Sequence, residues 1–195
     1  ICLKNNRFFV LDAVKKEPSI EQLEYFQQKL STFKFDLIIS IGGGSVTDTA
    51  KILSLVLKQS NKDMRISDFN KISFIDNIPL YSVPTTAGSG AELTSFATVW
   101  DYTSNEKHSF KSQFLLPKIA LYDYKLLKSL NYSVSVSSGF DTISHAFESI
   151  WNKFADPLSI NLSTQSLSLS MKSIRGYVIT EKKDPNLKNM QLASI

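Results

Sequence analysis

A short apolar segment that ends at consecutive glycines constrains the fold of this chain more than any other feature. Residues 36–41 are nearly all apolar, as expected of a strand that is buried on both faces of a parallel sheet. The glycines at 42–44 follow directly, and residues 46–58 then return to helical periodicity. A strand, a glycine turn and a helix in this order predict an α/β fold built from parallel βαβ units.

Further segments of the first half fit the same alternation. Ser19 and the glutamine three residues later form a capping box at the start of a helix over residues 20–33. A polar turn at 101–107 predicts a hairpin of the β-rich segments 95–100 and 108–114. Short apolar segments predict additional strands at 7–11, 80–83 and 118–122.

The character of the sequence changes near Leu130. Before it, residues 61–77 are polar and irregular, and they predict a loop or a short helix. After it no strand-like segment occurs, and helical spacing predicts long helices at 139–154 and 158–178. Pro157 separates them and suits the first turn of the second helix. We therefore predict a domain boundary near residue 130, with an all-helical part after it.

Composition excludes several classes of protein. The 195 residues are 43% hydrophobic, enough for a sizeable core, and the apolar runs are far shorter than the roughly 20 residues that span a bilayer. The net charge of +4 comes from scattered lysines, without the basic clusters of nucleic-acid-binding proteins. Cys2 is the only cysteine and no export signal is recognisable. We expect a cytoplasmic protein that binds neither nucleic acid nor a membrane.

The glycine turn has the composition of a phosphate-binding site. Backbone N–H groups and the positive end of a helix dipole favour an anion there, and Ser45 adds a hydroxyl donor. The spacing matches neither the dinucleotide fingerprint nor a Walker loop, so a purely structural turn is the alternative. For Asp48 and Lys51, in the helix that follows, the alternatives are compensation of the helix dipole and a solvated charge.

A second turn of small and hydroxyl-bearing residues, 84–92, follows the strand predicted at 80–83. If that strand is parallel to the one at 36–41, both turns lie at the carboxyl edge of the sheet, where open α/β sheets bind ligands. The two turns are then expected to face one ligand. An ordinary capped loop is the alternative for this segment.

A possible metal-binding pair lies in the predicted helix at 139–154. Asp141 and His145 are four residues apart, so both side chains point to one helix face. A carboxylate with an imidazole suits Fe²⁺ or Zn²⁺, and a hydrogen-bonded surface pair is the alternative. Glu148, on nearly the same face, is a third ligand, an acceptor for the imidazole N–H, or a solvated carboxylate. We expect His108, in the hairpin, to be a surface side chain.

Three motifs occur in the chain in a distinctive order and spacing. They are GGGSVTDTAK at 42–51, PTTAGSGAE at 84–92 and GFDTISHAFE at 139–148. Together they resemble the iron-containing (group III) alcohol dehydrogenase family. The resemblance implies a Rossmann-like, parallel-sheet nucleotide-binding domain over residues 1–130 and the beginning of an all-helical, metal-binding domain over residues 131–195. It also implies NAD or NADP and a divalent metal, Fe²⁺ before Zn²⁺, between the domains.

The resemblance also implies roles for single residues and a reaction. The metal ligands are Asp141 and His145. The implied reaction is reversible hydride transfer between a nicotinamide and a small alcohol or aldehyde, with the metal as Lewis acid, in a homodimer or higher homo-oligomer. The implied cofactor-binding residues are Gly43, Gly44, Ser45, Asp48, Thr85, Thr86, Ser89, Thr94, Lys107 and Leu126.

The chain departs from the family's pattern in several places. Ser89 replaces the more usual threonine, and Ala91 the more usual serine. The family has two further metal-binding histidines downstream, whereas no histidine follows His145. We therefore expect the chain to be an internal part of a longer enzyme. Two alternatives remain open: a specialised aldehyde reductase, for instance for phosphonoacetaldehyde, which residues 148–152 suggest, and a non-catalytic nucleotide-binding module with an incomplete metal site.

Overall fold

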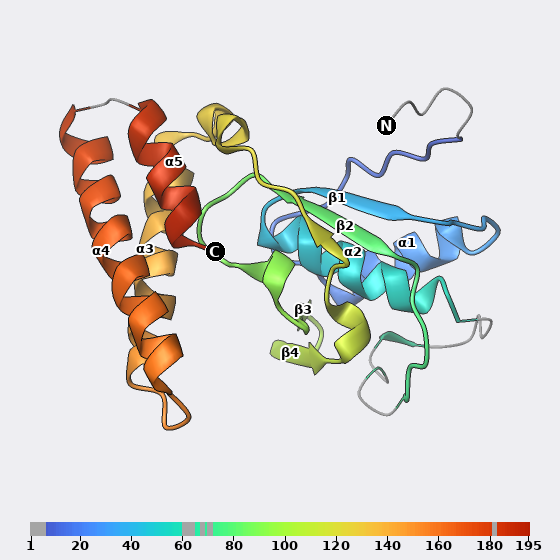
Figure 1. The fold of residues 1–195 in the computed structure, drawn as a ribbon. Coiled ribbons are helices and arrows are strands. Elements are labelled where there is room, and N and C mark those ends of the chain that lie inside the picture. Colours follow the sequence, from blue (N-terminus) through green and yellow to red (C-terminus); the bar gives the residue numbers. More distant parts are fainter. Residues whose placement is uncertain (1–6, 60–64, 67–68, 70–71, 181–182) are drawn as a thin grey trace.

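The computed structural model describes residues 7–59, 65, 66, 69, 72–180 and 183–195. An α/β part with a parallel sheet comes first along the chain, and helices follow it. In Figure 1 the helices lie together on the left and the sheet lies on the right. The predicted fold class is confirmed, and the domain division near residue 130 stays a prediction. Within the described residues, every helix is too short or too polar to cross a membrane.

The parallel sheet brings the ends of its strands to one edge. In the described part of the chain β1 (Ile38–Gly42), β2 (Leu80–Pro84) and β5 (Ile119–Ala120) are parallel, in the order β1-β2-β5. The register of β1 and β2 runs from Ile38 beside Leu80 to Gly42 beside Pro84. The N–H of Thr85 then donates to the carbonyl of Gly42 at 2.9 Å. The turns after β1 and β2 therefore leave the sheet side by side.

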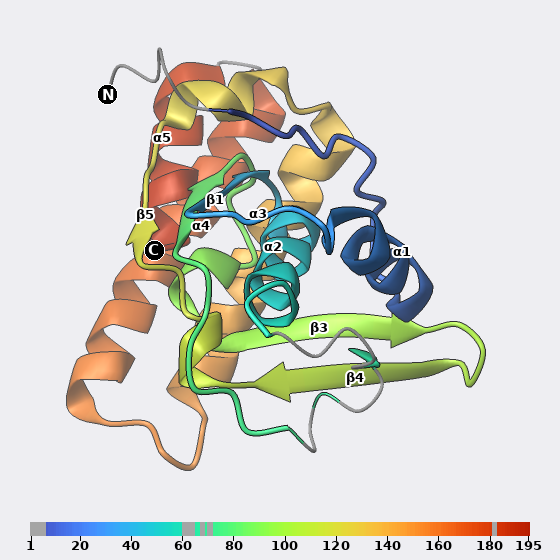
Figure 2. The ribbon, with the colours of Figure 1, turned by 90° about the vertical axis from the view of Figure 1, so that its right-hand side faces the viewer.

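Helix α2 (Gly44–Val56) lies between two β structures. On one side it packs on β1 and β2, and on the other side lies the antiparallel hairpin of β3 (Phe96–Asp101) and β4 (Glu106–Lys111), as Figures 1 and 2 show. The hairpin is thus confirmed. Helix α1 (Ile20–Leu30) packs beside α2, and its N-cap Ser19 accepts a hydrogen bond from the N–H of Gln22 at 3.2 Å, which is the first half of the predicted capping box. The Gln22 side chain instead accepts from the N–H of Lys15 at 3.2 Å and donates to the carbonyl of Ala13 at 3.1 Å.

The main hydrophobic core lies where α1, α2 and the hairpin meet. α1 and α2 each contribute one apolar face, and the hairpin closes the core from below in Figure 2. The short helix η3 (Gln113–Leu115), after β4, adds its last residue. The most deeply buried members are Leu23, Phe26, Ile52, Leu55, Val99, Phe110 and Leu115.

The helices α3 (Tyr132–Ile150), α4 (Pro157–Thr180) and α5 (Lys183–Ala193) share a second core. The short helix η4 (Tyr124–Ser129) leads into α3, which begins at Tyr132 because the side chain of Asn131 caps its first turn. Ala87, in the turn after β2, is buried in the same core, so this core joins the helices to the second turn. Its members are Ala87, Leu127, Ile174, Tyr177, Leu187 and Met190.

Residues 7–11, predicted as a strand, do not form one. Phe8 and Val10 are 63% and 77% exposed. A strand needs a hydrogen-bonded neighbour, and within the described residues no strand pairing joins this segment to the open edge of β1. At residues 7–11, apolar composition alone was therefore not enough to predict a strand.

Strand β1 was predicted to be buried on both faces, and this is wrong. Ser40 is 2% exposed, and its hydroxyl donates to Ser82 Oγ on the neighbouring strand β2 at 3.0 Å. Ser82 Oγ in turn lies 3.3 Å from Thr47 Oγ1 on α2, so this face of β1 is the one that α2 covers. Ile39 and Ile41, on the opposite face, are 47% and 63% exposed. That face of β1 is therefore partly open to solvent.

The helix predicted at 139–154 begins earlier and ends at Ile150, and α5 was not predicted as a separate helix. The helix predicted at 158–178 corresponds to α4. The loop predicted at 61–77 lies largely outside the described residues, and residues 72–77 have irregular structure.

Replacing Leu55 with alanine tests the main core. Leu55 is fully buried in α2, so Leu55→Ala is expected to lower the free energy of unfolding by about 2–5 kcal/mol. Urea unfolding followed by circular dichroism measures the change. The matched control is Leu158→Ala, because Leu158 is 68% exposed on α4; a change within about 0.5 kcal/mol is expected for it. Equal losses for both variants would contradict this description of the core.

Candidate cofactor and metal site

The turns after β1 and β2 fit against each other at glycine positions. A Cβ atom on Gly43 would lie 3.1 Å from Thr86 Cγ2, and one on Gly44 would lie 2.8 Å from Ser89 Oγ. Real Cβ atoms essentially never approach another heavy atom as closely as 2.8 Å, so a side chain at position 44 would require Ser89 to shift. The two turns form one surface at the carboxyl edge of the sheet, as the sequence predicted.

The start of α2 keeps donors available for an anion. Gly43 is the N-cap and has no side chain to accept the first free N–H groups of the helix. Ser45 Oγ accepts a hydrogen bond from the N–H of Glu17 at 3.3 Å, which leaves its own hydroxyl hydrogen free to donate. Free backbone donors, a hydroxyl and the helix dipole together favour a phosphate group.

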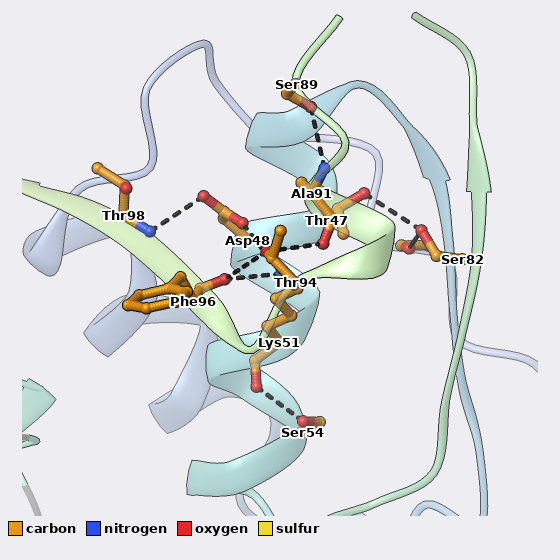
Figure 3. A network of polar contacts seen from close by, with 11 residues as sticks. Thr47, Asp48, Lys51, Ser54, Ser82, Ser89, Ala91, Thr94, Phe96 and Thr98 are labelled. Atoms are coloured by element: carbon orange, nitrogen blue, oxygen red, sulfur yellow. Dashed lines mark hydrogen bonds and ion pairs between the residues drawn. The ribbon is translucent and has the colours of Figure 1, made fainter. Parts of the chain in front are cut away.

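A buried polar network lies directly behind these turns (Figure 3). Lys51 has a side chain that is 0% exposed, and its Nζ donates to Thr94 Oγ1 at 3.0 Å and to the carbonyl of Phe96 at 2.6 Å. Asp48 Oδ1 lies 3.8 Å from the same nitrogen, and Asp48 Oδ2 accepts a hydrogen bond from the N–H of Thr98 at 3.0 Å. The alternative in which Lys51 is a solvated charge is therefore wrong.

Burial shifts the protonation of the groups in this network. Desolvation lowers the pKa of Lys51 to about 8, although Asp48 and Glu92 partly offset it. Desolvation raises the pKa of Asp48 above its ordinary value, against the hydrogen bond from Thr98 and the charges of Lys51 and Lys107. The ammonium and the carboxylate thus stabilise each other where water is excluded.

Glu92 extends the network toward the sheet. It lies in the short helix η2 (Ala91–Leu93), it is 4% exposed, and its Oε1 accepts a hydrogen bond from the hydroxyl of Tyr122 at 3.0 Å. Burial and the nearby carboxylate raise the pKa of Tyr122. Sequence analysis did not assign Glu92 or Tyr122 to the site, because pairing across 30 residues leaves no local pattern.

The structure gives the predicted cofactor residues different environments. Gly43, Gly44, Ser45, Thr86 and Ser89 meet in the interlocked turns. Thr85 continues the backbone pairing of the turns, whereas Asp48 and Thr94 belong to the network behind them. Lys107 is on β4, with Nζ 5.9 Å from the ring centroid of Trp100. Leu126 is half-buried in η4. Cofactor contact by any of these residues stays a prediction.

The predicted metal pair lies on α3 and is attached to the second turn. His145 Nε2 is 3.7 Å from Asp141 Oδ1, and both side chains are about half exposed, at 50% and 47%. His145 Nδ1 lies 3.3 Å from the carbonyl of Gly88, and because a carbonyl only accepts, we assign the imidazole hydrogen to Nδ1. Nε2 then presents a lone pair toward Asp141, so two metal donors converge.

The other candidate ligands do not join this pair. Glu148 Oε1 accepts a hydrogen bond from Ser144 Oγ at 3.4 Å, and His108 lies on β4, 3.8 Å from Glu106 Oε2. Among the described residues, no group of three histidine, cysteine, aspartate or glutamate side chains is arranged to hold a metal. Asp141 and His145 therefore fit a divalent metal as two of its ligands.

A cavity of about 400 Å³ lies beside His145, between the second turn and the helices. Leu93, Ala146, Leu162, Ala193 and Ile195 give it apolar walls, and several serine and threonine residues also line it. Thr142 closes one side, since its hydroxyl donates to the carbonyl of Ala87 at 3.2 Å. No lysine or arginine is among its lining residues, all of which belong to the described part of the chain.

Sequence comparison assigns the family. Residues 2–124 match the family model of iron-containing alcohol dehydrogenases, so the chain belongs to this family. It is 29% identical over 177 residues to an aldehyde-alcohol dehydrogenase of Streptococcus pneumoniae, covering 85% of this chain and 20% of that protein. It is 30% identical over 159 residues to EutG of Escherichia coli, a probable alcohol dehydrogenase, covering 81% of this chain and 40% of that protein.

Comparison with solved structures agrees on the fold. The sulfoacetaldehyde reductase of Bifidobacterium kashiwanohense, solved in complex with NAD⁺, superimposes with a TM-score of 0.86 at 22% identity. The match covers 93% of this chain and 48% of that structure. The chain therefore spans less than half the length of each of these relatives.

The lowered pKa of Lys51 predicts a pH dependence of stability. The folded protein releases the Lys51 proton at about pH 8, whereas the unfolded chain retains it to about the ordinary value of 10.5. Over this interval the unfolded state binds more protons, so the free energy of unfolding rises with pH. Above the ordinary tyrosine value of 10.0, the raised pKa of Tyr122 acts in the opposite direction, so the expected rise lies between pH 8 and 10.

Urea unfolding at about pH 7.5, 8.5 and 9.5 measures this rise. Lys51→Met should remove it. Lys58→Met is the control, because Lys58 lies two residues after the end of the same helix, has a side chain that is 44% exposed and pairs with Asp76 at the protein surface. A flat wild-type curve, or the same rise in Lys51→Met, would show that Lys51 is not the group responsible.

Proposed function

We propose that this chain forms the cofactor-binding turns of an NAD(P)-dependent alcohol dehydrogenase or aldehyde reductase, together with two ligands of its metal site. One observation carries the proposal. The second turn contacts the glycine turn through Thr86 and Ser89. It also contacts the metal pair through Gly88, whose carbonyl lies 3.3 Å from His145 Nδ1. A nucleotide and a metal bound at these places would lie side by side, as hydride transfer next to a Lewis acid requires.

The residues of the chain have separate tasks in this proposal. The backbone of Gly43 and Gly44 and the hydroxyl of Ser45 bind the pyrophosphate. The carbonyl of Gly88 holds the imidazole of His145 in the tautomer whose Nε2 can bind a metal. Asp141 and His145 would hold a divalent metal, which when bound would supply the positive charge that polarises a substrate oxygen.

The cavity beside His145 is the place that we propose for a small alcohol or aldehyde. Its walls are apolar and hydroxyl-bearing, and no lysine or arginine lines it. An anionic aldehyde, such as phosphonoacetaldehyde or the sulfonate that a structural relative reduces, would find neither lysine nor arginine in this cavity, so that only the metal proposed at His145 could offset its charge. The cavity therefore favours an uncharged substrate.

Enlarging Gly44 tests nucleotide binding at the interlocked turns. In Gly44→Ala the new Cβ would lie 2.8 Å from Ser89 Oγ and 3.1 Å from Ser89 Cβ, so Ser89 must shift, and we expect this shift to disturb the N–H donors of the first turn. We expect the affinity for NADH to fall by about tenfold or more, because a hydrogen bond to a charged group contributes about 1.5–3 kcal/mol. Titration of the chain with NADH, followed by nicotinamide fluorescence, measures the change.

Gly176→Ala is the control for this variant. Gly176 is in α4, away from both turns, and a Cβ there would lie 2.6 Å from Asn186 Oδ1, so the substitution introduces comparable crowding. It should leave NADH affinity unchanged. Failure of the wild-type chain to bind NADH or NADPH would overturn the proposal, and equal losses for both glycine variants would remove the turn as its basis.

Metal binding by the isolated chain should be weak. Two ligands leave at least two positions of a tetrahedral ion to water, so we expect Fe²⁺ or Zn²⁺ to be removed fully by EDTA and dehydrogenase turnover to be negligible. Isothermal titration should show that His145→Ala abolishes the weak binding, whereas His108→Ala leaves it unchanged. One tightly held ion per wild-type chain together with dehydrogenase activity would contradict this prediction.

A nucleotide-binding module without catalysis is the second candidate, and we keep it because the described residues include no group of three side chains arranged to hold a metal. The two candidates differ in what the remainder of the polypeptide contributes. Two histidines encoded after Ile195, at the family's spacing, support the enzyme, and a stop codon there supports the module. Sequencing the gene beyond this codon distinguishes them.

A further inference from the structure

Lys51 has a buried ammonium group to which the proposed reaction assigns no task. Its side chain is 0% exposed, so neither a nucleotide nor a substrate can reach it. A buried charge is costly, and an apolar side chain of similar volume would fill the same space in α2 without that cost. Packing alone therefore does not account for a lysine at this position.

A series of hydrogen bonds connects Lys51 to the second turn (Figure 3). Its Nζ donates to Thr94 Oγ1 at 3.0 Å. Thr94 Oγ1 donates to the carbonyl of Ala91 at 3.3 Å, and the N–H of Ala91 donates to Ser89 Oγ at 3.4 Å. Ser89 is the residue that meets Gly44 in the interlocked turns. Lys51 therefore lies directly behind the surface proposed for the nucleotide, without being part of it.

Asp48 places a negative charge close to the same surface. It follows Ser45 by three residues in α2, and residues at this spacing are neighbours on a helix, with Cβ atoms about 5–6 Å apart. A carboxylate there opposes the binding of an anion at the start of α2, and burial strengthens the repulsion. Asp48 Oδ1 lies 3.8 Å from Lys51 Nζ, so the ammonium group offsets this negative charge.

The other charges near this pair come from three elements. Glu92, on η2, is the second carboxylate that acts on Lys51, and Tyr122 donates a hydrogen bond to it. Lys107, on β4, acts on Asp48, but it is exposed, so water and salt weaken its effect. The strands β1 and β2 and the short helix η3, which also pack on α2, contain no charged residue. Four charged residues of the other packed elements do not contribute to the shifted pKa of Lys51: Glu21, Glu24 and Lys29 on α1, and Asp101 on β3.

We propose that the charge of Lys51 controls nucleotide binding: protonated Lys51 offsets Asp48 and lets the glycine turn bind the negative pyrophosphate, and loss of the proton to solvent weakens that binding. The inference rests on the proposed function, because it requires a nucleotide on the glycine turn. A neutral amine keeps two N–H donors, enough for Thr94 and the carbonyl of Phe96, so the second turn stays in place. Lys51 is thus a positioning residue that acts through Asp48, and not a catalytic residue.

The direction of the pH dependence follows from this linkage. Burial lowers the pKa of Lys51 to about 8 in the free chain. A bound pyrophosphate stabilises the protonated form, so nucleotide binding raises this pKa and takes up a proton. The affinity is therefore greatest below pH 8 and falls as the pH rises above it. The free energy of unfolding rises over the same interval, so unfolding cannot cause the loss of affinity.

Titration of the 195-residue chain with NADH, or with NADPH if that binds more tightly at neutral pH, tests the inference. Wild-type affinity should fall about fivefold or more from about pH 7 to about pH 9.5, because couplings between two sites are typically of this size or larger. Lys51→Met should abolish the fall. The control Lys58→Met should retain it, because Lys58 is 44% exposed beyond the end of the same helix. Equal wild-type affinity at both pH values, or the same fall in Lys51→Met, would overturn the inference.

A measurement of proton uptake tests the wild-type chain directly and keeps the inference testable even if Lys51→Met fails to fold. Isothermal titration at about pH 8.5, in buffers of different ionisation enthalpy, should show uptake of about half a proton per nucleotide. Release of protons, or no exchange, would overturn the inference.

Lys107→Met separates the two lysines that act on Asp48. This variant should bind the nucleotide more weakly and keep the pH dependence, because the buried lysine is unchanged. Loss of the pH dependence in Lys107→Met would assign it to Lys107 and overturn the inference. If no nucleotide bound to the wild type at neutral pH, the proposed function would fall and this inference with it. Binding without pH dependence would remove this inference alone.

Discussion

The buried ammonium group of Lys51 is the interaction on which the arrangement of this site depends. From α2 it donates to Thr94, just after η2, and to Phe96 at the start of β3, so one charge joins three elements. A charge is tolerated away from water only where hydrogen bonds and an opposite charge replace its hydration, and Asp48 supplies the opposite charge. Displacing the second turn would leave the ammonium without these partners. The turn is therefore held in one position relative to α2.

The position of the second turn matters because the turn contacts the glycine turn on one side and α3 on the other. On one side Thr86 and Ser89 meet the glycines, which leave room for them by lacking side chains. On the other side Gly88 meets α3 so closely that an added Cβ would lie 2.6 Å from the carbonyl of Ser138. The spacing between the cofactor surface and the metal pair is thus set by four consecutive residues, and it does not require the helices and the sheet to meet over a large interface.

Local signals and distant contacts account for what the sequence could and could not predict. The strand–glycine–helix unit, the hairpin and the spacing of Asp141 and His145 follow from periodicity and turn chemistry within a few residues. The burial of Lys51 does not, because its partner Thr94 is 43 residues away and a lysine in a helix is usually solvated. The hydrogen bond from His145 to Gly88 spans 57 residues, so it could not be predicted from local sequence either. The strand predicted at residues 7–11 was wrong for the opposite reason. The local composition is strand-like, but within the described residues no strand pairs with this segment.

The metal pair shows how a half-complete site can still be well defined. With the imidazole hydrogen engaged by Gly88, the lone pair on Nε2 faces a carboxylate oxygen at 3.7 Å, too far for a hydrogen bond and unfavourable between two electron-rich atoms. A cation between them relieves that repulsion. The pair therefore specifies where a positive charge belongs without supplying enough ligands to hold a metal tightly. The other ligands must come from water, from substrate or from another segment of polypeptide, so the affinity for metal depends on groups beyond these two, and its location depends on the second turn.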